Sequence, residues 1–227
     1  MRVVAFDIDG TLLLSGGAGA RALDRAFLEL HGVPDAFRGI HPHGMTDGDI
    51  IQEMGRRTLG RGMTDDEAAL LRERYARLLQ DELPRSEGFH LMPGVEALLR
   101  RLSREGDVLL GLVTGNYEET ALMKLAHGGL DAYFRFGGYG SDSDERVELT
   151  RVGVERGRKM AGLAESDGAV FLVGDTVHDI RCGKEAGARV IAVATGSTSE
   201  EALRDHGPEW VLPDLTDIDG FLRILRS

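Results

Sequence analysis

Four stretches of the chain are almost continuously apolar and have the length of buried strands. They cover residues 3–8, 108–114, 170–174 and 190–195. Strands of a parallel sheet are buried on both faces, so they carry continuous apolar runs rather than alternating ones. Apolar residues with helical spacing lie between these runs, at residues 95–102, 121–125 and 152–160. The alternation of strands and helices predicts an α/β fold with a doubly wound parallel sheet.

Residues 16–88 do not follow this alternation of strands and helices, because they contain helical patterns and no convincing strand. One apolar stripe runs from Ala22 to Leu30, and another runs from Leu71 to Leu79. The second stripe is preceded by Thr64 and Glu67, which have the spacing of a capping box at a helix start. We therefore predict an all-helical domain at 16–88, inserted into an α/β core made of residues 1–15 and 89–227.

Composition and charge narrow the classes of partner. The net charge of −11 argues against nucleic-acid binding, which needs clustered Lys and Arg to neutralise phosphates. No window approaches the roughly 20 consecutive apolar residues of a membrane span, and two acids interrupt the opening apolar run. The single cysteine, Cys182, fits a reducing compartment and core packing. We expect a cytoplasmic monomer or homodimer that has no membrane or nucleic-acid partner.

Polar residues follow three of the predicted strands. Asp7 and Asp9 end the first run, Thr114 begins the stretch Thr114-Gly115-Asn116 after the second, and Asp175 and Asp179 follow the third. Ligands of open parallel sheets bind beyond the carboxyl ends of the strands, so these side chains are expected at one edge. Carboxylates packed this closely repel one another unless a cation joins them, and Mg²⁺ prefers oxygen ligands. The pattern predicts a magnesium site.

The segments DIDGTL, LVTGN and GDTVHD, in this order, resemble motifs one, two and four of the haloacid dehalogenase superfamily of phosphohydrolases. The helical insert resembles the family's cap domain, and the segments GVEALLRRL and AGARVIAVATG resemble the phosphoglycolate phosphatase branch. The resemblance implies an Mg²⁺-dependent phosphatase that acts on a small phosphorylated metabolite, such as phosphoglycolate. A sugar-phosphate mutase, or a phospho-aspartate switch that does not hydrolyse, would use the same residues and stays open.

The same resemblance assigns roles to individual residues. Asp7 would attack phosphorus and form an aspartyl-phosphate, and Asp9 would protonate the leaving alkoxide and then activate water. Thr114 and the N–H groups of Gly115 and Asn116 would hold the phosphoryl oxygens. The candidate metal ligands are Asp7, Asp9 through its backbone carbonyl, Asp175 and Asp179, of which Asp179 is expected to orient waters or neighbouring groups instead.

The family's third motif usually supplies a Lys, often followed by Pro at a helix start, and no Lys-Pro pair occurs here. Three cations lie in the corresponding stretch: Arg146, Arg151 and Lys159. An Arg can serve because it is always charged and its fork fits carboxylate or phosphate oxygens. We favour Arg151, which stands directly before the apolar helical pattern that begins at Val152.

Residues of the predicted cap are harder to assign. Thr46 and Asp47 either face the substrate or cap the helix that contains Ile50, and sequence alone favours neither. His41 and His43 form an H-x-H pair without a third ligand, which is typical of a polar loop. For His178, inside GDTVHD, we expect a place at a helix start.

Overall fold

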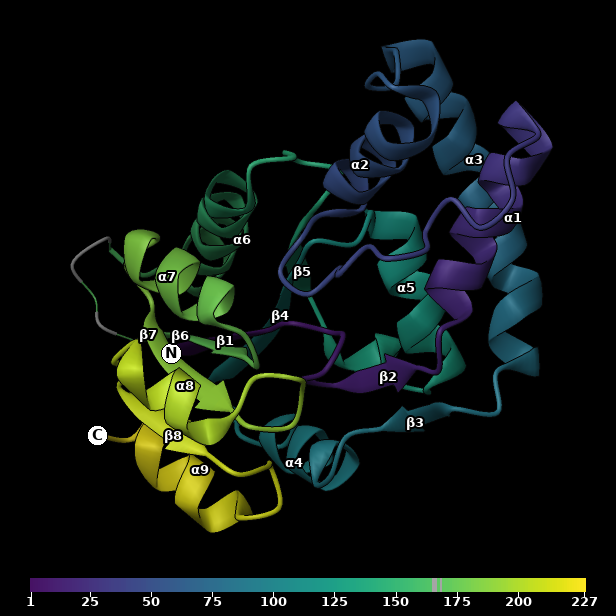
Figure 1. Ribbon diagram of the computed structural model, residues 1–227. Coiled ribbons are helices and arrows are strands. Elements are labelled where there is room, and N and C mark those ends of the chain that lie inside the picture. Colours follow the sequence, from purple (N-terminus) through teal and green to yellow (C-terminus); the bar gives the residue numbers. More distant parts are fainter. Residues whose placement is uncertain (165–166, 168) are drawn as a thin grey trace.

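The computed structural model describes residues 1–164, 167 and 169–227 (Figure 1). Within these residues the core is a six-stranded parallel sheet with the order β5-β4-β1-β6-β7-β8. The strands are β1 (Arg2–Phe6), β4 (Val108–Thr114), β5 (Phe136–Tyr139), β6 (Val170–Gly174), β7 (Arg189–Val193) and β8 (Trp210–Leu212). The predicted doubly wound α/β fold is confirmed. The edge strands β5 and β8 were not predicted, because both are short and β5 has two glycines in place of an apolar run.

Helices cover both faces of the sheet. One face carries α6 (Arg146–Ala161), α7 (Val177–Glu185) and α8 (Glu200–Asp205). The other carries α4 (Val95–Leu102), α5 (Glu118–His127), η2 (Asp131–Tyr133) and α9 (Ile218–Leu225). The apolar run of β1 is continuous because both of its faces are covered: Val3 and Ala5 pack in one cluster with α6, whereas Val4 and Phe6 pack in another with α4, α5 and α9.

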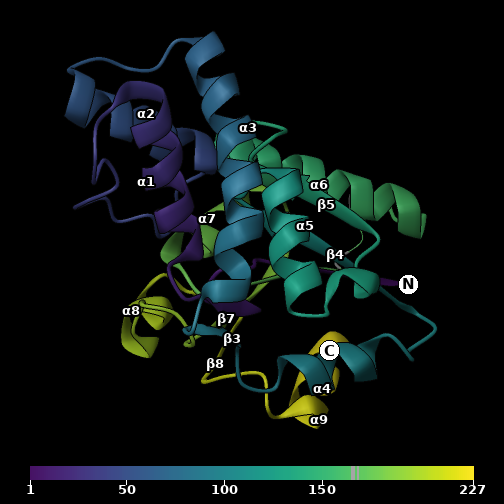
Figure 2. The same ribbon diagram turned by 90° about the vertical axis from the view of Figure 1, so that its right-hand side faces the viewer.

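A helical insert lies between the two strands of a small antiparallel pair, β2 (Leu13–Ser15) and β3 (Phe89–Leu91). It consists of α1 (Ala18–His31), α2 (Asp47–Leu59), α3 (Asp65–Glu82) and η1 (Leu83–Arg85). Helices α1 and α3 lie side by side, and α3 also contacts α5 of the core (Figures 1 and 2). The insert has its own hydrophobic cluster, which includes Phe27, Met54 and Leu78.

The predicted capping box at the start of α3 is confirmed. Thr64 Oγ1 accepts a hydrogen bond from the Glu67 backbone N–H at 3.3 Å, and the Glu67 carboxylate accepts from the Thr64 N–H at 2.9 Å. This pairing satisfies two N–H groups at a helix end that faces solvent.

Strand β1 lies at the centre of the sheet, between β4 and β6. The chain crosses over from β1 to β4 on one side, and β6 pairs with β1 on the other side. Phe6 pairs with Leu112 on β4 and with Val173 on β6. The residue that follows, Asp7, therefore emerges between the ends of two neighbouring strands, at the position where parallel sheets bind ligands. Among the described residues, no helix is long and apolar enough to span a membrane.

Candidate active site

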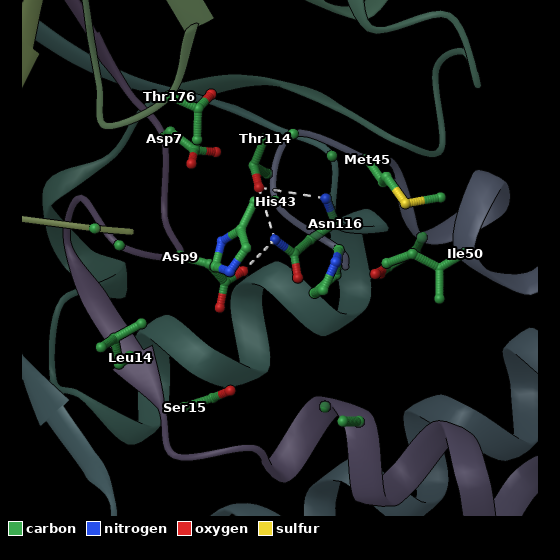
Figure 3. A pocket seen from close by; sticks show the side chains of 18 of the residues that line it. Asp7, Asp9, Leu14, Ser15, His43, Met45, Ile50, Thr114, Asn116 and Thr176 are labelled. Carbon is green, nitrogen blue, oxygen red and sulfur yellow. Dashed lines mark hydrogen bonds between the residues drawn. The ribbon is translucent and has the colours of Figure 1, made fainter. Parts of the chain in front are cut away.

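A cavity of about 470 Å³ lies between the carboxyl edge of the sheet and the helical insert. Its core wall includes Asp7, Asp9, Thr114, Asn116 and Asp175, which come from the ends of β1, β4 and β6. In Figure 3, Asp7, Thr114, Asn116 and Asp9 lie above Leu14 and Ser15 of β2. The polar residues predicted at three strand ends thus lie together around one cavity.

Three buried carboxylates form a cluster at this edge of the sheet, and two of them, Asp7 and Asp175, line the cavity. One oxygen from each of Asp7, Asp175 and Asp179 lies within 4.8 Å of the others. Burial raises the pKa of Asp7 well above its usual range, and the charges of Asp179 and Asp175 raise it further. Burial and the charge of Asp179 likewise raise the pKa of Asp175 to about 7. Acids held this close without a cation destabilise one another's ionised forms.

The surroundings of Asp175 fit a metal ligand. Its Oδ1 accepts a hydrogen bond from Thr11 Oγ1 at 3.0 Å, whereas its Oδ2 is buried and has no hydrogen-bond partner among the described residues. Two glycines keep the space beside that oxygen open. A Cβ at Gly10, whose φ is 92°, would lie 2.6 Å from Asp175 Oδ2, and one at Gly196 would lie 1.7 Å from it. A buried, unsatisfied carboxylate oxygen with open space beside it is what a hard cation requires.

Asp9 points away from this cluster, toward α5. Its carboxylate accepts hydrogen bonds from Lys124 Nζ, at 2.9 and 2.7 Å to its two oxygens, and from Asn116 Nδ2 at 2.7 Å. Asn116 Oδ1 accepts the third Lys124 bond at 2.5 Å, and Asn116 Nδ2 also lies 2.7 Å from Thr114 Oγ1. The Asp9 side chain is therefore not part of the carboxylate cluster, and any metal bond from Asp9 has to come from its backbone carbonyl.

Lys124 was not recognised as a site residue from the sequence, although its position within the helical pattern is unusual for a lysine. Its side chain is only 5% exposed, and it lies between the buried residues Ala121 and Leu125 on the inner face of α5. A lysine at a position that helical spacing assigns to the core is rarely buried without a partner. Such a residue is a candidate for contact with a carboxylate beyond the strand ends.

The cation beside Asp7 is Arg146. Its side chain is 9% exposed, and its Nη2 donates to Asp179 Oδ1 at 2.6 Å and to Asp7 Oδ1 at 3.4 Å. Its Nη1 lies 2.9 Å from the Cβ position of Gly115. Burial lowers the pKa of Arg146, but the charges of Asp179 and Asp7 raise it by more, so the guanidinium stays charged.

The expectation that Arg151 supplies this cation needs correction. Helix α6 begins at Arg146, six residues before the apolar pattern at Val152 that was taken as its start. Five residues further along a helix, Arg151 is rotated by about 140° from Arg146 and faces solvent. Its side chain is 45% exposed and pairs with Glu148. Lys159 is also exposed and lies outside the cavity.

The two candidate residues of the insert have different positions. Thr46 is buried and caps α2, since its Oγ1 accepts from the Asp49 N–H at 3.1 Å, and it does not line the cavity. Asp47 does line the cavity, and it also joins the insert to the core. Its carboxylate accepts from the Tyr117 N–H at 2.9 Å and from Thr120 Oγ1 at 3.0 Å. Burial raises the pKa of Asp47 to about 6, against the lowering effect of Lys124.

The remaining polar candidates lie nearby. His43 is exposed and lines the mouth of the cavity, which the reading of the H-x-H pair as a polar loop did not anticipate, whereas His41 does not line it. His178 is the second residue of α7, near the helix start as expected. Cys182 is buried, and it packs within α7.

Two curated relatives match nearly the whole chain. The phosphoglycolate phosphatase of Synechococcus elongatus is 28% identical over 221 residues, which are 96% of this chain and 95% of the relative. The pyrophosphatase PpaX of Halalkalibacterium halodurans is 28% identical over 228 residues, which are 97% of each chain.

Solved structures show the same fold. The crystal structure of a predicted phosphoglycolate phosphatase from Haemophilus somnus matches with a TM-score of 0.74 at 20% identity and covers 98% of each chain. The structure of CbbY from Rhodobacter sphaeroides in complex with phosphate matches with a TM-score of 0.73 at 20% identity and covers 96% of each chain. The family model of the haloacid dehalogenase-like hydrolases matches residues 4–193, which include all three strand-end motifs and the whole insert. This chain belongs to the haloacid dehalogenase-like hydrolases.

Proposed function

We propose that this protein is an Mg²⁺-dependent phosphatase that hydrolyses a small phosphorylated metabolite through an aspartyl-phosphate on Asp7. The observation that carries this proposal is the position of the Asp7 carboxylate, which is buried in the cavity wall beside Arg146 and within the acidic cluster, with Asp9 two residues away. The names of the relatives support hydrolysis of a phosphoester or phosphoanhydride, and they make phosphoglycolate the first ester to assay. A cytoplasmic location, expected from the sequence, stays a prediction.

Two proton transfers and two displacements would complete the reaction. Asp7 attacks phosphorus, the bond from phosphorus to the ester oxygen breaks, and Asp9 gives its proton to the leaving alkoxide. Asp9 then takes a proton from a water molecule that attacks the phosphorus of the aspartyl-phosphate, which releases phosphate and restores Asp7. The Thr114 hydroxyl, the N–H groups that follow it and Arg146 Nη1 would hold the phosphoryl oxygens, and their position at the cavity supports this role.

The residues present fit a divalent cation. Asp7, Asp175 and the backbone carbonyl of Asp9 would hold Mg²⁺, with Asp179 behind them as the partner of Arg146. When bound, Mg²⁺ would offset the charge of the carboxylates and of the phosphoryl oxygens. Arg146 supplies the second positive charge that an aspartate nucleophile needs in order to approach a dianionic ester.

The helical insert, residues 16–88, would act as a cap over the core of residues 1–15 and 89–227. The backbone N–H of Asp47 donates to Gly115 O at 2.8 Å, and Arg72 of α3 pairs with Glu119 of α5 at 2.6 Å. These contacts hold the insert over the strand ends and limit access of water to the cavity.

Incubation of the purified protein with phosphomonoesters and Mg²⁺ tests this function. We expect one free phosphate for each free alcohol. A mutase would instead produce an isomer of a sugar phosphate without net phosphate, and a phospho-aspartate switch would stop after one turnover. Either result would contradict the proposed hydrolysis.

Removal of divalent cations should abolish phosphate release, and added Mg²⁺ should restore it. Mg²⁺ should also raise the unfolding midpoint of the wild type measured by calorimetry, because a ligand that binds only the folded state stabilises it. Asp175→Asn should lose both effects, whereas Asp66→Asn, on an exposed turn of α3, should keep them. Full activity in thoroughly demetallated protein would contradict the metal assignment.

Lys124→Met should lower kcat by about 100-fold on propyl phosphate, the usual size of a general acid's contribution, with little change in KM. The reason is that Lys124 holds Asp9 in place for protonation of the leaving alkoxide. The loss should be much smaller on 4-nitrophenyl phosphate, whose leaving group needs no proton. Lys159→Met, at an exposed position, is the matched control. An equal loss on both esters would mean that Lys124 is only structural.

A further inference from the structure

The insert side of the cavity is apolar. Six of its lining residues have hydrocarbon or thioether side chains: Ala20, Leu23, Phe37, Pro42, Met45 and Ile50. Leu14 of β2 continues this surface toward the core. A leaving group that occupies this half of the cavity would therefore have little but apolar surface around it.

Two neutral polar groups also line this half of the cavity, the Ser15 hydroxyl and the Tyr75 phenol. Burial and the charges of Asp47 and Asp9 raise the pKa of Tyr75 well above its usual range, so the phenol stays protonated. Gly19 also lines the cavity beside the phenol, and a Cβ at that position would lie 3.3 Å from the Tyr75 oxygen. These groups can hydrogen-bond a hydroxyl or carbonyl, but they cannot neutralise an anion.

The permanent cations that line the cavity, Lys124 and Arg146, belong to the core and contact core carboxylates. Lys124 has three N–H donors, and these match three acceptors, the two Asp9 oxygens and Asn116 Oδ1. Arg146 is held by Asp7 and Asp179 on the phosphoryl side. The insert contributes no Arg or Lys to the described lining, and its one imidazole, His43, is exposed.

The carboxylates on this side oppose a second anion. Asp47 and Asp9 both line the cavity next to the apolar wall. A substrate that carries a carboxylate or a second phosphate beside its phosphoester would have to bury that charge near two acids without a free cation. Burial of an unpaired charge is strongly unfavourable, and nearby like charges add to the cost.

We infer that the natural substrate is a phosphomonoester of an uncharged, partly apolar alcohol, and that esters with a second anionic group are poor substrates. This inference rests on the proposed phosphatase function and specifies its leaving group. It separates this chain from the activities named for its relatives, because phosphoglycolate and pyrophosphate both carry a second anionic group.

Matched pairs of esters test this inference with the wild-type enzyme. Phenyl phosphate is compared with 3-carboxyphenyl phosphate, whose phenol leaves with comparable ease, and ethyl phosphate is compared with phosphoglycolate. We expect kcat/KM to be at least about tenfold higher for the uncharged member of each pair, a difference of about 1.4 kcal/mol. Equal or higher values for the carboxylated esters would overturn the inference and leave the phosphatase function intact. No release from any ester would overturn the phosphatase function, and this inference with it.

A charge placed in the wall gives a second test. Ser15 is half-buried at the cavity wall, so Ser15→Lys introduces an ammonium without removing a core side chain. Ser15→Met has similar length and no charge, and it serves as the control. The preference for phenyl phosphate over 3-carboxyphenyl phosphate should fall at least about threefold in Ser15→Lys, mainly through KM, because an ammonium pairs with the carboxylate. An unchanged preference in a folded Ser15→Lys protein would contradict the inference.

Discussion

Asp7→Asn should lower phosphate release by about four orders of magnitude or more, as expected when a nucleophile is removed. The amide is nearly the same size as the carboxylate but cannot form a stable bond to phosphorus. Its fold should be intact, because Asp7 lies at a strand end and its backbone N–H bonds to Val173 O in either variant. Phosphate release from several esters and the far-UV circular dichroism of the variant measure these two effects.

The stability of Asp7→Asn without metal gives a control for this result. Burial and three neighbouring acids raise the pKa of Asp7, so the folded state loses stability as the pH rises above the ordinary pKa of a carboxyl toward that raised pKa. A neutral amide removes this cost, and Arg146 keeps its bond to Asp179. The unfolding midpoint at pH 8 in chelator should therefore equal or exceed that of the wild type. Substantial turnover by a folded Asp7→Asn protein would remove Asp7 from the nucleophile's role.

Arg146→Ala should lower turnover by about 1,000-fold, the low end of the effect of a transition-state arginine. Arg146 lies within 3.4 Å of Asp7 Oδ1, and it supplies positive charge where the ester and the nucleophile repel each other. Arg146→Lys should recover part of the activity, because lysine restores the charge without the forked geometry. Steady-state kinetics on one ester compare the three proteins.

Two controls separate catalysis from folding in this series. Arg151→Ala should keep nearly normal turnover, since that side chain is exposed and pairs with Glu148 on the solvent face of α6. Removal of Arg146 leaves Asp179 buried without its cation, which costs about 3 to 5 kcal/mol. Arg146→Lys keeps that charge and should fold when Arg146→Ala does not. A collapse of activity in Arg151→Ala, with near-normal turnover in Arg146→Lys and Arg146→Ala, would reverse the assignment.

Sequence patterns predicted the centre of the fold better than its edges. Strands β1, β4, β6 and β7 are buried on both faces, so their apolar runs stand out from the rest of the chain. In strand β5, α6 packs closely against Gly138, where a Cβ would lie 2.2 Å from Leu149 O, and a Cβ at Gly137 would lie 2.3 Å from the Tyr139 ring. That close packing removes the side chains by which a strand is recognised.

The strand-end residues of the candidate site could be predicted because the register of a parallel sheet brings them together. The cations could not be assigned in this way, because their positions depend on helices: Arg146 was one of three candidates but not the favoured one, and Lys124 was not considered. The first turn of α6, Arg146-Val147-Glu148-Leu149, alternates charged and apolar residues and does not stand out as helical, so the apparent start at Val152 lies past Arg146. Lys124 reaches Asp9 from 115 positions away in sequence, and only the packing of α5 on the sheet shows that contact.

A quench experiment on Asp9→Asn tests the central claim, phosphoryl transfer to Asp7, most directly. This variant lacks the base for the second step, whereas 4-nitrophenyl phosphate needs no acid in the first. Radiolabelled 4-nitrophenyl phosphate is mixed with the variant and Mg²⁺, the reaction is stopped in acid, and the peptides are mapped by mass spectrometry. The account predicts close to one labelled phosphoryl group per chain, located on Asp7. Release of nitrophenol without label on Asp7, or with label on another residue, would contradict it.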